Sequence, residues 1–164
     1  MFTFKNLNGK KAITIPQEFS ERISNTVAKR FNVKDKYRLK DKLDGAFFLE
    51  KQILRLFPCF FIQKVLNIKL LDENKPLFCT TTFEYQNDRC FAIGTKDLLK
   101  VKIPKVNNVD YYMIFHIVES PPKVKYAGKI SHKKCIELSS NSLRQGNNTV
   151  IQPPLVVIQL TDLQ

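Results

Sequence analysis

The fold is decided by the stretch Val109-Asp110-Tyr111-Tyr112-Met113-Ile114-Phe115-His116-Ile117-Val118. This stretch is rich in β-branched and aromatic residues, which favour an extended backbone. Its apolar residues do not alternate with polar ones, so a strand formed here would be buried on both faces. The sequence therefore predicts a central β-strand that ends at Pro121-Pro122, with other strands on either side of it.

Shorter strand signals surround this stretch, separated by turn residues every 8 to 12 positions. They cover residues 66–70, 78–85, 89–93, 98–103, 123–126, 135–138, 150–151 and 155–160. Residues 46–57 fit a helix almost as well as a strand. We therefore expect a mainly β protein (a β-rich α+β fold), built as an antiparallel barrel or sandwich of about eight short strands.

The N-terminal part predicts a short hairpin over residues 1–15 and then one amphipathic helix over residues 16–31. The helix is indicated by apolar side chains spaced four residues apart, at Phe19, Ile23, Val27 and Phe31. Thr14 is the expected N-cap, with Gln17 three residues later as in a capping box.

With 164 residues, the chain is expected to form a single domain over 1–164. Its expected parts are a hairpin, helix and basic connector (1–44), an antiparallel β core (45–138), and a polar loop with a C-terminal strand (139–164). The N-terminus lacks a signal-peptide apolar segment, and charged residues interrupt the apolar stretch 54–71. We therefore expect a cytoplasmic protein with no membrane contact, in which free buried thiols are favoured over disulfides for the four cysteines.

The sequence gives little support to catalysis. His116 lies in the apolar strand, where a structural histidine is favoured, and His132 lies in a basic turn. A catalytic dyad of Cys135 or Cys59 with a histidine remains an alternative. The signal is not specific, because any protein with four cysteines and two histidines offers such a pair. Since metal-ligand spacings, phosphate-binding glycine loops and paired carboxylates are absent, we expect no enzyme activity, cofactor or metal.

Basic charge is the strongest functional signal, because the net charge of +12 is concentrated in two segments. Segments 29–42 and 123–134 each carry a net charge of +5, and the rest of the chain is close to neutral. On a strand, Lys100 and Lys102 would lie on one face with apolar neighbours on the other, as would Lys123 and Lys125. Lysines on edge strands also prevent aggregation, so a solvated surface is the competing interpretation.

Clustered cations next to aromatic rings are typical of proteins that bind single-stranded nucleic acid. We therefore expect a non-catalytic nucleic-acid-binding protein, which binds single-stranded DNA or RNA through a basic β surface with aromatic stacking. The alternative is a small coat-like assembly subunit or a protein-interaction module, with self-association through edge strands. The candidate binding residues are Lys29, Arg30, Lys34, Lys36, Tyr37, Arg38, Lys40, Lys42, Lys100, Lys102, Lys123, Lys125, Tyr126, Lys129, Lys133 and Lys134.

Overall fold

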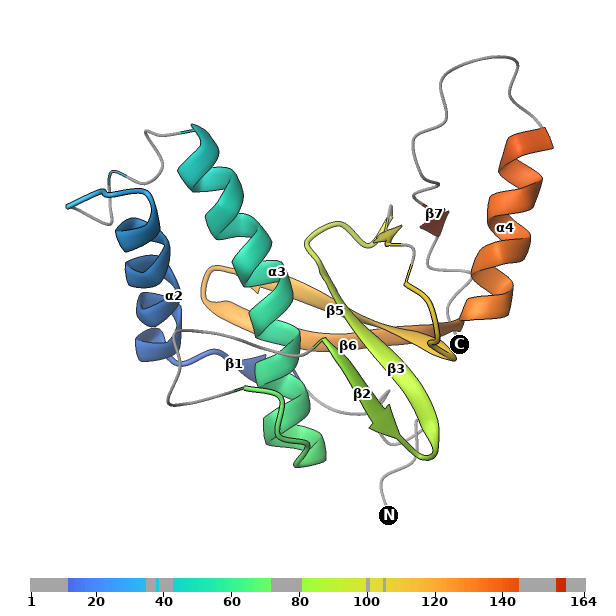
Figure 1. The fold of residues 1–164 in the computed structure, drawn as a ribbon. Coiled ribbons are helices and arrows are strands. Elements are labelled where there is room, and N and C mark those ends of the chain that lie inside the picture. The colour runs from blue at the N-terminus through green and yellow to red at the C-terminus, as the bar shows by residue number, and fades with distance from the viewer. Residues whose placement is uncertain are drawn as a thin grey trace.

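A computed structural model describes residues 12–34, 38, 43–71, 81–99, 101–104, 106–144 and 156–158. Within these residues the chain forms three helices, a curled five-stranded sheet shaped as a half-barrel, and a separate pair of strands (Figure 1). The fold is α+β, so the prediction of a mainly β barrel or sandwich with about eight strands is wrong. Most of the predicted N-terminal hairpin, residues 1–11, lies outside the described residues.

The five-stranded sheet has the strand order β1–β6–β5–β3–β2. Neighbouring strands are antiparallel except β3 and β5, which are parallel, so the sheet is mixed. Its strands are β1 (Ile13–Thr14), β2 (Thr82–Tyr85), β3 (Asp88–Thr95), β5 (Tyr111–Glu119) and β6 (Pro122–Ser131). The turn between β2 and β3 has positive φ at both Gln86 and Asn87, the geometry of a two-residue hairpin.

β5 occupies the middle of the sheet, which confirms the prediction of a central strand. Met113 and Phe115 belong to the core on one face of the sheet, whereas Tyr112 and Ile114 belong to the core on the other. All four side chains are essentially inaccessible to solvent. The continuous apolar run is therefore explained by burial on both faces.

The largest error of the sequence analysis concerns α3 (Leu43–Leu66), which covers the ambiguous residues 46–57 and continues beyond them. Pro58 lies inside this helix, although proline interrupts the backbone hydrogen bonds of a helix and favours its termination. Burial of the apolar side chains around it outweighs this penalty, since Leu56, Phe57 and Phe61 are almost fully buried. The helix ends at Leu66 because Asn67 has a positive φ of 56°, so the predicted strand 66–70 is wrong.

The core is divided between the two faces of the sheet. On one face α3 packs against the sheet, and α2 (Gln17–Arg30) packs against α3 (Figure 1). The opposite face is covered at one end by β4 (Val101–Ile103) and by the first turns of α4 (His132–Arg144). The segment 45–138, which was expected to be an antiparallel β core, is thus a long helix followed by a mixed sheet.

α2 confirms the predicted N-terminal helix, with Phe19, Ile23 and Val27 on its buried face. The predicted cap is wrong, because Thr14 belongs to β1 and Pro16 precedes the first helical residue. The helix ends at Arg30, and Asn32, two residues later, has a left-handed backbone with a φ of 52°.

α4 replaces the predicted strand 135–138 and the first part of the predicted polar loop 139–149. Its start is fixed by Ser131, whose Oγ accepts a hydrogen bond of 3.2 Å from the backbone N–H of Lys134. A serine at the N-cap commonly accepts a hydrogen bond from the N–H three residues later. Ser131 was not identified as an N-cap from the sequence. β7 (Val156–Ile158) pairs with β4, in agreement with the predicted C-terminal strand.

Three cysteines, Cys59, Cys90 and Cys135, are buried and free, which confirms the predicted thiols for these positions. Cys79 lies outside the described residues. No helix in the described part of the chain is long and apolar enough to cross a membrane.

Candidate nucleic-acid interface

The first predicted basic segment is only partly described. Lys29 and Arg30 are exposed in the last turn of α2, and Lys34 and Arg38 are exposed after it. The other four candidates of this segment lie outside the described residues: Lys36, Tyr37, Lys40 and Lys42. Basic residues at a helix C-terminus are also favoured by the helix dipole, so the positions of Lys29 and Arg30 fit a structural role as well.

The second predicted segment does not form one basic face. Lys123 and Lys125 alternate with buried Val124 and Tyr126, as predicted, and lie on the sheet face opposite α3. A register shift between β5 and β6 then places Lys129 opposite Met113, on the face that α3 covers. Lys133 and Lys134 begin α4, which starts roughly 25 Å along β6 from Lys123.

The aromatic side chain proposed for this segment is not placed to stack on a base. Tyr126 is only 3% exposed, and its ring packs edge-on against Phe115 at a centroid distance of 5.7 Å. Lys102 is exposed between buried Val101 and Ile103, as the alternation predicted, while Lys100 lies outside the described residues.

The structure reveals a different basic surface, on the exposed side of α3. Phe47, Lys51 and Arg55 follow one another at intervals of four residues, so they share one side of the helix. All three are exposed, and the Lys51 Nζ lies 5.5 Å from the centroid of the Phe47 ring. The sequence pattern does not predict this surface, because residues 46–57 fit a helix and a strand almost equally well.

A first pocket lies between α2 and α3, and we call it the interhelical pocket. It has a volume of about 200 Å³ and contains Arg30 from α2 and Phe48 and Arg55 from α3. The guanidinium carbon of Arg30 lies 4.2 Å from the centroid of the Phe48 ring, a cation–π contact that orients the Arg30 side chain. The remaining lining residues are Ile23, Thr26, Val27 and Gln52.

A second pocket of about 390 Å³ lies where α3 meets the edge of β3, and we call it the strand-edge pocket. Lys51 and Arg55 are its cationic residues. The rest of the lining is mostly apolar and consists of Leu54, Thr81, Phe91, Ala92, Ile93, Gly94 and Pro104. Because Arg55 lines both pockets, they adjoin each other along α3, and we refer to the pair as the α3 groove.

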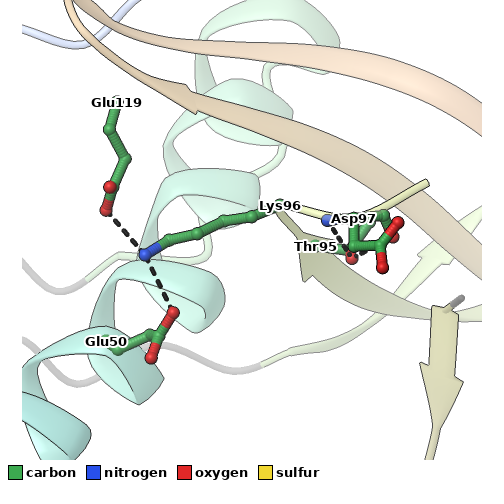
Figure 2. Close-up of polar contacts among 5 residues, drawn as sticks. All are labelled: Glu50, Thr95, Lys96, Asp97 and Glu119. Carbon is green, nitrogen blue, oxygen red and sulfur yellow. Dashed lines mark hydrogen bonds and ion pairs between the residues drawn. The ribbon is translucent and has the colours of Figure 1, made fainter. Parts of the chain in front are cut away.

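Among the residues that the structure describes, three cationic side chains and no carboxylate line the α3 groove. The neighbouring ion cluster shown in Figure 2 combines one cation, Lys96, with two carboxylates. The Lys96 Nζ lies 2.8 Å from the Glu50 carboxylate of α3 and 2.7 Å from the Glu119 carboxylate of β5. The ion cluster therefore joins α3 to the ends of two strands beside the groove.

The ion cluster is built around the turn that follows β3. Thr95 Oγ1 accepts a hydrogen bond of 3.1 Å from the Asp97 N–H, and Asp97 Oδ1 accepts one from Leu99. This turn presents Lys96 to both carboxylates (Figure 2). Burial by itself lowers the pKa of Lys96, but the hydrogen bonds to Glu119 and Glu50 outweigh it, so the pKa is raised.

Two buried thiols in the described part of the chain, Cys90 and Cys135, are not activated as nucleophiles. Burial raises the pKa of Cys90 to about 12 and that of Cys135 to about 11, so both are protonated at neutral pH. His132 is held by a 3.1 Å hydrogen bond between its Nδ1 and the Tyr112 hydroxyl. No group of three metal-ligating side chains is found in the part of the chain that the structure describes.

Comparison with known proteins gives no further assignment: neither a protein-family model, nor a curated protein, nor a solved structure matches this chain.

Proposed function

We propose that this protein binds nucleic acid without catalysis, and that the α3 groove holds the phosphate backbone. The observation that carries the proposal is a groove whose lining, in the part of the chain that is described, contains Arg30, Lys51 and Arg55 and no carboxylate. A phosphate chain that meets such a groove releases its condensed counterions, which favours binding at low salt. The net charge of +12 adds long-range attraction for any polyanion.

Aromatic rings accompany these cations. Phe47 is 61% exposed next to Lys51, and Phe48 lies against Arg30. Cations and exposed rings are the two ingredients by which proteins hold nucleic acid without reading its sequence. Phe48 is partly buried between α2 and α3, so the exposed ring of Phe47 takes the place of Tyr126, whose ring is buried.

The proposal is tested with a fluorescent oligonucleotide and two double variants of equal charge. Lys51→Ala/Arg55→Ala removes two cations from the groove, whereas Lys123→Ala/Lys125→Ala removes two from the opposite sheet face. We expect the first variant to lose about tenfold or more in affinity at low salt, and the second to bind nearly as the parent does. The reverse ranking would place the interface on the sheet, and no binding by the parent at low salt would refute the proposal.

The second candidate function is assembly through a sheet edge, and one observation favours it. Among the described residues, the outer edge of the ten-residue strand β6 is paired only at its N-terminal end, where Pro122, Lys123 and Val124 meet residues 13–15. An extended edge of this kind can accept a strand from a second copy of the chain. Elution from a sizing column as one defined oligomer at every salt concentration would support this function, and monomeric elution would refute it.

A further inference from the structure

We infer that the strand-edge pocket takes one unstacked base of a single-stranded nucleic acid, with the adjoining phosphates on Lys51 and Arg55. The inference rests on the proposed function and adds the class of ligand that the groove selects. It differs from backbone binding alone, since a cationic surface holds single and double strands by the same electrostatics.

The shape and chemistry of the strand-edge pocket fit a flat, mostly apolar ring system. Its volume of about 390 Å³ falls within the roughly 300–1,000 Å³ typical of small-molecule sites. Leu54, Phe91, Ile93 and Pro104 supply the apolar lining, and Phe91 is the aromatic residue among them. Contact between a base and an aromatic ring stabilises binding by about 1–3 kcal/mol per base.

The lining of the pocket is held in place by the surrounding structure. The Phe91 ring packs edge-on against Tyr112 at a centroid distance of 6.2 Å, and the Tyr112 hydroxyl contacts His132. At the other wall, Gly94 of β3 approaches the Leu54 carbonyl so closely that a Cβ at this position would collide with it. A preformed pocket loses little conformational entropy when a ligand enters.

The charge at the rim of the pocket selects the occupant. Lys51 and Arg55 lie about one helical turn apart, about 6 Å along the axis, and both line the pocket. A ligand that fills the pocket and also contacts both cations combines an apolar ring with anionic groups next to it. A nucleotide within a single strand has this composition, whereas a base in a duplex must first be unstacked at a cost of a few kcal/mol.

The test compares an oligothymidylate with an oligonucleotide of equal length made only of abasic sites, at the same low salt. Both strands carry the same phosphates, so binding of both supports the proposed phosphate contacts independently of the base pocket. We expect the base-containing strand to bind the wild-type protein about 5- to 100-fold more tightly. Equal affinities would overturn the base pocket and leave the proposed function standing, and no binding of either strand would overturn both.

The fluorescence of a tryptophan introduced at the pocket reports whether a base lies next to it. The chain contains no tryptophan of its own, so there is no other tryptophan signal. In Thr81→Trp the new indole lies in the pocket lining, and in the control Ile136→Trp it lies on an exposed site of α4. We expect oligothymidylate to quench the first fluorophore and not the second, and the abasic strand to quench neither. Tighter binding of oligothymidylate without quenching at position 81 would place the base elsewhere and overturn the inference.

An acidic peptide is the competing occupant of a cationic groove with apolar lining. A glutamate-rich peptide with aromatic side chains is added to the complex of the Thr81→Trp protein and labelled oligothymidylate. We expect no displacement at micromolar peptide in physiological salt. Displacement with quenching of Trp at position 81 would show that the groove is a peptide site and would overturn the inference.

Discussion

At Gly94 the sheet and helix α3 approach each other so closely that the position has no room for a side chain. A Cβ on this residue would collide with the carbonyl oxygen of Leu54 and come within 2.8 Å of Ile117 Cδ1. The Leu54 carbonyl is the one that Pro58, four residues later, cannot satisfy with an N–H donor. Gly94 therefore lies against the helix carbonyl that Pro58 leaves without an N–H donor, at the contact between α3 and β3.

Gly94→Ala is expected to destabilise the protein, because the obstacle at Leu54 is backbone and cannot rotate away. We expect the free energy of unfolding to fall by about 2–3 kcal/mol, the range of overpacking in a dense core. Urea denaturation followed by circular dichroism measures this change. A loss below about 0.5 kcal/mol would contradict the close approach of β3 to α3.

The buried thiols give a second prediction at the scale of single residues. In a Cys79→Ser background, we expect a thiol reagent at pH 8 to leave Cys59, Cys90 and Cys135 unmodified in the native protein and to modify all three in urea. All three are buried, and burial raises the pKa of Cys90 to about 12. Rapid native modification of any of the three, measured by mass spectrometry, would contradict their burial.

The same thiols set a dependence of stability on pH. The folded protein keeps protons on Cys90 and Cys135 at a pH where unfolded thiols, with their ordinary pKa of 9.0, have lost them. The free energy of unfolding should therefore decrease as the pH rises from about 9 toward 11 and 12. Urea denaturation at pH 8 and pH 10.5 measures the effect, and equal stability at the two values would contradict it.

At the scale of elements, Lys96 connects α3 to the sheet. We expect Lys96→Met to lower the free energy of unfolding by up to about 1 kcal/mol at pH 7, since partly exposed ion pairs contribute little individually. The raised pKa means that the contribution is complete below pH 10.5 and is lost as the pH rises through the folded value. Lys69→Met, at an exposed site after α3, is the control and should change stability by less.

The start of α4 is a further test at this scale. Ser131→Ala removes the hydroxyl that accepts the Lys134 N–H, and loss of such a cap costs about 1 kcal/mol. Ser131→Thr retains a hydroxyl and should recover most of this stability. Equal stabilities of the three proteins in urea would show that Ser131 does not determine where the helix begins.

The elements that the sequence predicted correctly are those with a strong, unambiguous pattern. α2 has apolar residues every fourth position, and β5 has an uninterrupted apolar run. The helices α3 and α4 were not predicted, for different reasons. In α3, Pro58 indicates the end of a helix, but burial of the residues around it outweighs the proline penalty. In α4, residues 135–138 are too short a stretch to distinguish a strand from a helix.

At the scale of the whole molecule, the sequence located an excess of positive charge but not the surface that carries it. Of the residues predicted to bind, Arg30 lines the α3 groove, whereas Lys123 and Lys125 lie on the other side of the sheet. Lys51 and Arg55 belong to neither charged segment, and only the helical spacing from Phe47 would have indicated them. A bulge between β5 and β6 separates the remaining lysines, and a sequence pattern does not reveal a bulge.

The central claim, that groove cations contact phosphates, is tested most directly by the slope of log Kd against log salt for single-stranded DNA. Each phosphate contact adds about 0.7 to this slope. We predict that Lys51→Ala/Arg55→Ala lowers the slope by about 1.4, since two contacts of about 0.7 each are lost, and that Lys123→Ala/Lys125→Ala leaves it unchanged. An unchanged slope for the groove variant would contradict the account.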